Sequence, residues 1–235
     1  MKHFQRVTDQ PLEQYRYERK FLVERMDDRQ IRTLIMMHPA MFVMPYPPRW
    51  VNNIYLDTPQ LDNYTENVSG AVDRCKVRLR WYHQLFEESS PAVLEFKIKH
   101  GLVGKKLQYQ VDPFKLDTQF NRKYMERYFE VSDLPFEVKQ KLKGQMPVLV
   151  NRYQRWYFAT RDGRFRVTVD SDMVYYHVGL LENAFRYRHE ERLLKVVELK
   201  YQQADDLLAS RIAGALPFTV YKNSKYVYGM DCVYW

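Results

Sequence analysis

Apolar and charged residues alternate with a period of two along several stretches of the chain. In DRCKVRLRW, residues 73–81, single apolar residues separate the cations Arg74, Lys76, Arg78 and Arg80. Because a β-strand sends successive side chains to opposite faces, this stretch predicts a strand with four cations on one face. Taken alone, it is typical of an amphipathic strand whose charged face lies in water.

The same pattern recurs in four further stretches, VLEFKIK, GRFRVTVD, VVELKY and RYERKF. Their charged faces carry Arg and Lys with only a few carboxylates. A solvated sheet face usually mixes both charge signs with Thr, Ser and Gln. Five strands with one plan therefore indicate cationic faces that are directed at an anion.

The alternation and the turn residues together predict the elements of the fold. Strands are expected near 15–25, 49–57, 73–83, 91–100, 105–112, 148–160, 164–170, 173–178, 192–201 and 221–228, and helices at about 27–38, 117–129, 135–143 and 202–213. Regular alternation of strands and helices is missing, which favours antiparallel pairing in an α+β fold. No repeat, low-complexity tract or Gly/Ser-rich linker divides the 235 residues, so we expect one domain, with residues 1–14 as an N-terminal arm.

A closed barrel would accommodate strands that each have one cationic and one apolar face. Many like charges inside a barrel repel one another unless an anion or carboxylates offset them. Phosphate suits such a lumen, because Arg binds its oxygens in a bidentate manner and Lys adds point charges. The carboxylates would then orient Lys and Arg, or hold a divalent cation that bridges phosphate oxygens. We therefore expect an antiparallel barrel with a charged interior, an apolar outer face and helices packed outside.

Composition supports an anionic partner without identifying it. The chain has 37 Lys and Arg against 29 Asp and Glu, a formal net charge of +8, which suits phosphate, nucleic acid or an acidic membrane surface. Two cysteines exclude a disulfide framework and a cysteine zinc site. The N-terminal residues lack the apolar segment of a signal peptide, and no apolar run approaches membrane-spanning length. We expect a cytoplasmic protein without a transmembrane segment.

An ordered set of motifs resembles a known family. RYERKF, YLDT, KVRLRW, LEFKIK, NRYQRWYF, FRVTVD, VELKY and KNSKY follow one another between about Tyr15 and Asp231. In this order they resemble the VTC domain, the polyphosphate polymerase branch of the triphosphate tunnel metalloenzyme (CYTH-like) superfamily. The resemblance implies an eight-stranded antiparallel tunnel that binds triphosphate or polyphosphate together with Mn²⁺ or Mg²⁺.

The resemblance also implies roles for individual residues. The phosphate-binding positions assigned to catalysis are Arg78, Arg80, Lys97, Arg155 and Arg166. Those assigned to substrate binding are Lys20, Lys76, Lys106, Lys200, Lys222, Ser224 and Lys225. In the hairpin after Lys97 both Lys105 and Lys106 fit, and Lys106 is favoured. Glu198 matches the metal-binding glutamate, with Glu18 as a second candidate.

One departure separates this chain from other tunnel enzymes. Triphosphatases and class IV cyclases of the superfamily typically begin with ExExK, whereas Arg16 occupies the first glutamate position here. The loss of one carboxylate that would lie near the metal ion favours the polymerase branch. Eukaryotic VTC proteins also carry a membrane channel and a regulatory domain, so coupling to a membrane would need a separate partner protein.

The expected activity is transfer of the γ-phosphoryl group of ATP onto a growing polyphosphate chain. Phosphoryl transfer needs in-line alignment and charge neutralisation more than a protein nucleophile, so cations and one metal ion suffice. A triphosphate or short polyphosphate hydrolase and a non-catalytic sensor of polyphosphate or inositol phosphates remain alternatives. Nucleic acid is not expected, because an RNA-binding sheet places aromatic rings on its cationic face and here they mostly alternate to the other face.

Several of these residues also have a purely structural interpretation. Glu198 with Lys200, and Glu18 with Lys20, could be ion pairs that hold the sheet together. Asp170 and Asp172 are expected to cap or turn the end of a strand, although Asp170 shares a face with Arg166.

Overall fold

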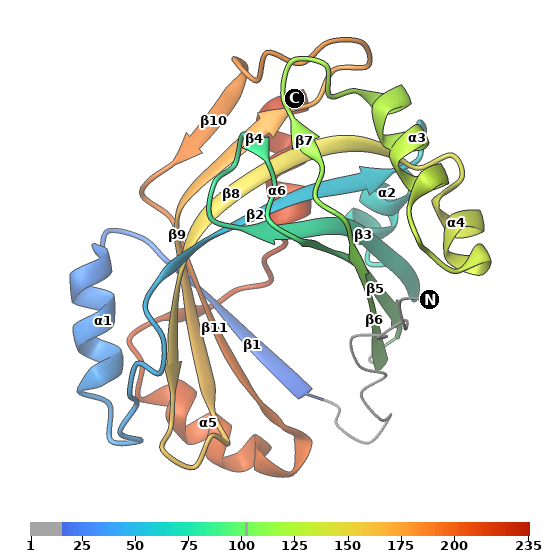
Figure 1. Ribbon diagram of the computed structural model, residues 1–235. Coiled ribbons are helices and arrows are strands. Elements are labelled where there is room, and N and C mark those ends of the chain that lie inside the picture. Colours follow the sequence, from blue (N-terminus) through green and yellow to red (C-terminus); the bar gives the residue numbers. More distant parts are fainter. Residues whose placement is uncertain (1–15, 102) are drawn as a thin grey trace.

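A computed structural model describes residues 16–101 and 103–235, and a single antiparallel sheet dominates it (Figure 1). Its eight long strands are β1 (Arg16–Val23), β2 (Arg49–Asp57), β3 (Asp73–Tyr82), β5 (Ala92–His100), β6 (Val103–Val111), β8 (Met146–Ala159), β9 (Arg166–His177) and β11 (Lys195–Gln202). They lie in the order β1-β11-β9-β8-β2-β3-β5-β6. Short strands β12 (Thr219–Val220) and β10 (Arg188–Glu191) pair with β1 and β9, and β4 (Glu87–Glu88) pairs with β7 (Lys115–Leu116) in a separate sheet.

The sheet curls strongly, so that one of its faces is concave (Figure 1). Within the described residues the path of pairing ends at β12 on one side and β6 on the other, which makes the sheet an open, curled form of a barrel. The predicted antiparallel sheet of eight long strands with charges inside is confirmed, and the helices lie outside it with the exception of α6 (Lys225–Tyr234). The proposed arm, residues 1–14, lies outside the described residues.

Two apolar clusters cover the convex face, as the alternation predicts. Helices α3 (Arg122–Val131) and α4 (Phe136–Leu142) pack through Met125, Phe129, Val138 and Leu142 on the apolar side of β3 and β5. Helices α1 (Asp28–Met36) and α5 (Asp206–Gly214), the latter following the short helix η1 (Gln203–Asp205), cover β9 and β11. Leu79, Trp81 and Val197 are fully buried in these clusters. Burial of this apolar face is what turns the charged alternate residues toward the concave side.

Helix α6 (Lys225–Tyr234) corrects the strand predicted at 221–228. Ser224 caps the helix by accepting a hydrogen bond from the Val227 amide at 3.4 Å. Tyr226, Met230 and Val233, which have helical spacing, are buried against the concave side of β2, β8 and β9. Their burial outweighs the strand preference of the Tyr- and Val-rich sequence. One helix therefore lies inside the curl, where all helices were expected outside.

The contact between α6 and the sheet is close enough to require glycine. A Cβ atom on Gly229 would lie 2.7 Å from Leu149 Cδ2, and closer still to the ring of Tyr175. The helix is further fixed by Tyr226, whose hydroxyl donates to the buried carboxylate of Asp57 at the end of β2. The N-terminus of α6 is thus held at a defined position over the concave face.

Other differences from the predicted elements are local, among them the short strands β4, β7 and β12, which were not predicted. Helix α2 (Asp62–Ser69) was not predicted, because its sequence DNYTENVS is polar and short; Gly70 ends it at a φ of 72°. The strands predicted at 164–170 and 173–178 are one strand, β9, which continues through Asp172 at a φ of 48° opposite an irregularity in β8. Strand β10 was also missed. No helix within the described residues is both long and apolar enough to cross a membrane.

Candidate functional site

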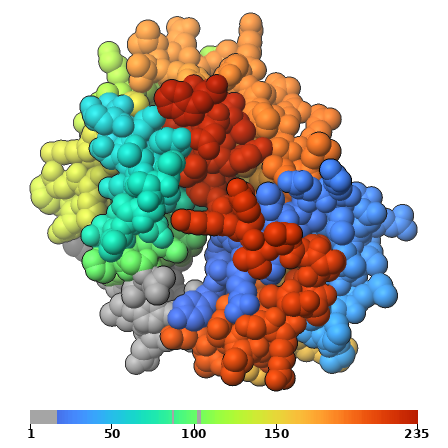
Figure 2. Space-filling model, turned by 180° about the vertical axis from the view of Figure 1, so that it is seen from behind, coloured from blue at the N-terminus to red at the C-terminus, as the bar shows by residue number. Residues whose placement is uncertain are grey.

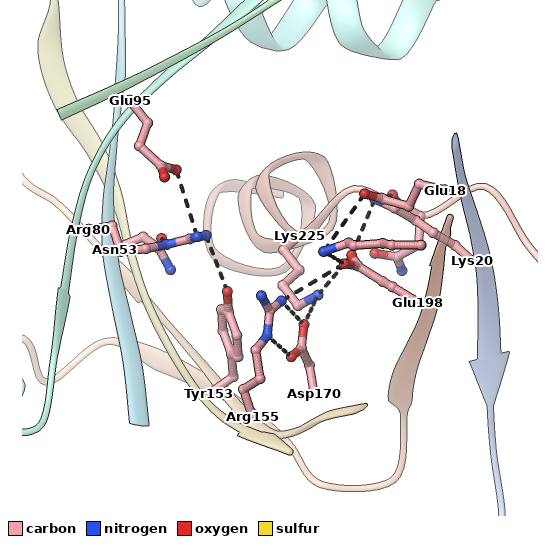
Figure 3. Close-up of polar contacts among 12 residues, drawn as sticks. Glu18, Lys20, Asn53, Arg80, Glu95, Tyr153, Arg155, Asp170, Glu198 and Lys225 are labelled. Atoms are coloured by element: carbon pink, nitrogen blue, oxygen red, sulfur yellow. Dashed lines mark hydrogen bonds and ion pairs between the residues drawn. The ribbon is translucent and has the colours of Figure 1, made fainter. Parts of the chain in front are cut away.

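Charged side chains from seven strands and from the start of α6 meet on the concave face, and Figure 3 shows part of this group. Cross-strand register brings them together: Arg78 lies opposite Glu95, Lys76 opposite Lys97, and Lys20 opposite Glu198. Registered partners point to the same side of a sheet, so these pairs share the concave face. Nine cations and four carboxylates contact or neighbour one another on this face. The cations are Lys20, Lys76, Arg78, Arg80, Lys97, Lys106, Arg155, Lys200 and Lys225, and the carboxylates are Glu18, Glu95, Asp170 and Glu198.

Glu95 on β5 is the centre of the first cluster. Its carboxylate lies 2.6 Å from Arg78 Nη2, 2.6 Å from Lys106 Nζ and 3.8 Å from Arg80 Nη1, and it accepts a hydrogen bond from Gln108 at 2.9 Å. Burial disfavours the charged form, but Arg78 and the other cations outweigh burial and hold the pKa of Glu95 far below its usual range. The carboxylate therefore stays ionised and fixes the positions of three cations.

Asp170 on β9 organises the second cluster. Arg155 donates to both of its oxygens, from Nε at 2.6 Å and from Nη2 at 2.7 Å, and Lys225 Nζ lies 2.6 Å away. Asp170 is fully buried, and Arg155 and Lys225 overcome the effect of burial and lower its pKa. The bidentate geometry fixes the plane of the Arg155 guanidinium. Asp170 is thus a mid-strand ion-pair partner, and the prediction that it caps a strand end is wrong.

Glu198 on β11 and Glu18 on β1 share two lysines in the third cluster. Lys20 Nζ lies 3.0 Å from Glu18 and 3.6 Å from Glu198, and Lys200 Nζ lies 2.9 Å from Glu198 and 4.0 Å from Glu18. Burial opposes the charge of Glu198, but Lys200 and Lys20 lower its pKa well below the usual value. Lys20 also donates to the Asn223 carbonyl at 3.1 Å, just before α6.

Tyr153 on β8 joins the first two clusters. Its hydroxyl accepts from Arg80 at 3.5 Å, and its ring centre lies 5.2 Å from the Arg155 guanidinium and 5.1 Å from Lys225 Nζ. The same Arg80 side chain also donates from Nε to Asn53 Oδ1 at 3.0 Å. Arg80 at the hydroxyl and Arg155 and Lys225 beside the buried ring thus form one continuous group of cations.

Two lysines on the concave face form no ion pair with a carboxylate among the described residues, although Glu18 lies near Lys97. Lys76 Nζ donates to Ser224 Oγ at 2.7 Å. Burial, then Lys20 and Lys97, lowers the pKa of Lys76 to about 7. Burial likewise lowers the pKa of Lys97 to about 8. Lys97 is nevertheless accessible to water, as expected for a cation that lines a hollow enclosed by protein. A bound anion would therefore stabilise the charged forms of these two lysines more than those of the other cations.

The concave face opens to the surface of the molecule. Figure 2 shows a hollow bordered by β1 (blue), the segment from α2 to β3 (cyan to green) and the segment that leads into α6 (orange to red). Lys222 belongs to this border: it is exposed, and its Nζ lies 3.8 Å from the position of a Cβ on Gly70, at the end of α2. A polyanion thus has a route to the cations inside.

The structure brings together most of the residues assigned from the sequence, but they differ in exposure and in their contacts. Arg166 begins β9 opposite Lys200 and is exposed, and none of the described residues forms an ion pair with it. Lys106 contacts Glu95 on the concave face, whereas Lys105 lies opposite Ile98 on the other side of the sheet. Sequence reasoning assigned no site role to Glu95, Asp170, Tyr153 or Asn53, although alternation already placed Glu95 and Asp170 on the cationic faces.

The expectation about aromatic residues also needs correction. Trp81, Phe96 and Phe165 face the outer clusters as expected. The tyrosines Tyr55 and Tyr153, however, lie on the concave face, where their hydroxyls accept from Arg78 and Arg80. The concave face is therefore cationic with tyrosines interspersed.

The carboxylates fit a divalent cation that is held jointly with a phosphate ligand. No group of three His, Cys, Asp or Glu side chains suited to a metal occurs in the part of the chain that the structure describes. Glu198 and Glu18 do lie close enough to share Lys20 and Lys200, and Asp170 is already occupied by Arg155 and Lys225. Mg²⁺ is commonly bound by one or two carboxylates plus substrate phosphates, which matches the Glu198 and Glu18 pair.

Solved structures of other proteins share the overall fold of this chain. A candidate adenylate cyclase from Bacillus halodurans has a similar structure, with a TM-score of 0.53 at 10% identity over 90% of this chain and 94% of that chain. A candidate adenylate cyclase from Vibrio parahaemolyticus is similar with a TM-score of 0.50 at 11% identity, over 93% and 98% of the two chains. At such identities the likeness concerns the fold alone. No curated protein is significantly similar in sequence.

The family assignment comes from the sequence. The model of the VTC domain matches residues 15–234, which include every strand of the curled sheet and helix α6. A match over nearly the entire length establishes that the chain belongs to the VTC domain family.

Proposed function

We propose that the protein is a polyphosphate polymerase that uses ATP. The terminal phosphate oxygen of a polyphosphate chain attacks the γ-phosphorus of ATP, the bond between that phosphorus and the β–γ bridging oxygen breaks, and ADP leaves. The chain grows by one phosphate. The observation that carries the proposal is the concave face itself, where these nine cations and four carboxylates meet.

The arrangement of the cations suits a reaction between two polyanions. Arg78 and Arg80 are held by Glu95 on one wall, and Arg155 and Lys225 are held by Asp170 on the other. Donor and acceptor phosphates repel each other, and fixed cations on both sides offset that repulsion and align the reacting atoms. Lys20, Lys76, Lys97 and Ser224, between the walls, would bind the rest of the phosphate chain. Arg166, Lys106, Lys200 and Lys222 would bind phosphates farther out.

A divalent cation, Mn²⁺ or Mg²⁺, would complete the site at Glu198 with Glu18. Such an ion, held by these two carboxylates, would neutralise part of the phosphate charge. Lys20 and Lys200 contact both carboxylates and would keep them in place before the substrate arrives. Glu198→Gln should abolish metal-dependent turnover and leave polyphosphate binding measurable.

The test is incubation of the purified protein with ATP and Mn²⁺, with phosphate chains resolved on a gel. Arg155→Met should stop chain formation, because it removes the guanidinium held by Asp170. Arg127→Met is the matched control, since it removes an exposed arginine of α3 far from the sheet's concave side. Long chains from the wild type and from Arg127→Met, and none from Arg155→Met, support the proposal. Release of free phosphate without chains would support a triphosphate hydrolase instead, and tight chain binding without turnover a sensor.

A further inference from the structure

Tyrosines and one arginine are layered at one end of the charged face. The Arg49 guanidinium lies between two rings, 4.3 Å from the centre of Tyr82 and 4.8 Å from the centre of Tyr157. Its Nε also donates to the Tyr157 hydroxyl at 2.8 Å. Tyr46 packs edge-on against Tyr157 with ring centres 6.2 Å apart, and 63% of its surface is exposed. We call Tyr46, Arg49, Tyr82 and Tyr157 the tyrosine stack.

The tyrosine stack adjoins the phosphate-binding wall. Arg49 lies opposite Arg155 in the pairing of β2 with β8, so the two side chains share the concave face. Tyr157 follows Arg155 by two positions and Tyr82 follows Arg80 by two positions, which places both rings on that face as well. Helix α6 covers the other half of β8, at Val148 and Leu149. The stack therefore forms an uncovered end of the site, directly beside Arg155.

This chemistry differs from that of the rest of the site. Phenol rings carry no charge to bind phosphate, and the stack has no carboxylate that would attract a metal ion. A core role does not explain it either, because Arg49 and Tyr46 are exposed. Flat rings and a flat guanidinium bind other flat aromatic groups by stacking, and nucleobases are bound in this way with little dependence on sequence.

We propose that the tyrosine stack is the nucleobase subsite of the nucleoside triphosphate donor. The inference rests on the proposed function, because it assumes that the adjoining cations bind the triphosphate. The triphosphate extends from Arg155 toward Arg78 and Lys225. The base lies outside the charged hollow and stacks on the exposed ring of Tyr46. The nucleotide thus enters with its phosphates first, at the end of the sheet where β2 begins and β8 ends.

The test compares the dissociation constants of ATP and inorganic tripolyphosphate, measured by calorimetry without turnover. Tyr46→Ala should weaken ATP binding about tenfold, the order expected for loss of one base stack, and leave tripolyphosphate binding unchanged. Tyr46→Trp should bind ATP at least as tightly as the wild type. Tyr187→Ala is the matched control, because Tyr187 is 64% exposed, beside His177 near β10, and it should change neither constant.

Each outcome decides between the proposals. Equal effects of Tyr46→Ala on both ligands, or no effect on either, would overturn the nucleobase subsite while the phosphate site stands. A wild-type protein that binds neither ligand would overturn the phosphate site and the subsite together. Neither binding measurement depends on chain synthesis. A failure of the polymerase assay therefore does not alter the comparison of ATP with tripolyphosphate.

Discussion

Replacing Glu95 with glutamine would remove the negative charge that three cations share. Arg78 and Lys106 lie 2.6 Å from its carboxylate, and Arg80 lies 3.8 Å away. Glutamine keeps the size and one oxygen acceptor but cannot balance the cations. If the concave face depends on a few carboxylates to tolerate its positive charge, this variant should be strongly destabilised, and a bound polyanion should restore its stability.

The size of the effect follows from burial. Loss of one partner from a buried ion pair costs about 3–5 kcal/mol. The side chains of Arg78 and Lys106 are 14% and 41% exposed, so water screens part of the freed charge, and the lower end of that range, about 3 kcal/mol, is expected. For a protein of this size the midpoint of thermal unfolding should fall by about 6–12 °C. The matched control is Glu130→Gln, an exposed glutamate at the end of α3, which should stay within about 0.5 kcal/mol.

The assay is thermal unfolding with and without inorganic tripolyphosphate. A ligand at 100 times its dissociation constant stabilises a folded protein by about 2.7 kcal/mol. The Glu95→Gln variant should gain more than the wild type at the same ligand concentration, because the ligand supplies the missing negative charge. A loss below about 1 kcal/mol, or an equal gain in both proteins, would refute the view that Glu95 neutralises the phosphate-binding cations.

Three smaller predictions concern α6 and the central lysines. Gly229→Ala should lower the free energy of unfolding by about 1–3 kcal/mol in urea, because its Cβ would lie 2.7 Å from Leu149; an unchanged midpoint contradicts the close packing of α6. Ser224→Ala should cost about 1 kcal/mol through loss of the helix cap, and Ser224→Asp should retain most of that stability in the same urea titration. At pH 8 the wild type should take up more protons on binding tripolyphosphate than Lys76→Met does, because burial and neighbouring cations lower the pKa of Lys76 to about 7 in the free protein and a bound anion raises it. Calorimetry in two buffers with different heats of ionisation measures this uptake, and equal uptake by the two proteins would be the contrary result.

The same lysines affect stability in a defined direction. The pKa values of Lys76 and Lys97 are lowered to about 7 and about 8 in the folded protein, burial being the first cause. The unfolded chain, with ordinary lysine pKa values near 10.4, therefore binds more protons between about pH 7 and pH 10. Their contribution makes the ligand-free protein more stable as the pH rises through this window.

The sequence predicts the concave face well because the signal for it is local. Alternation alone assigns the faces of residues 73–82, since a strand has a period of two and its apolar side must be buried. Partners across strands are not a local property. Nothing in the spacing of β3 and β5 shows that Glu95 lies opposite Arg78, or that Arg155 meets Asp170, because these contacts depend on register and on curling of the sheet.

The error at residues 221–228 has a similar origin. Tyr226 and Tyr228 alternate with other residues and have high strand preference, so the local pattern favours a strand. The helix is selected by the sheet beneath it, on which Tyr226, Met230 and Val233 are buried. Their i, i+4, i+7 spacing after a Ser was a helix signal in the sequence, but it becomes decisive only when the concave surface that it covers is known.

The most direct measurement of the central claim is a crystal structure of the protein with inorganic tripolyphosphate. The ligand should lie on the concave face, with its oxygens within hydrogen-bond distance of Arg78, Arg155 and Lys225. Tripolyphosphate bound only on the outer face, or a concave face left without ligand at saturating concentration, would contradict the claim that these cations form a site for linked phosphates.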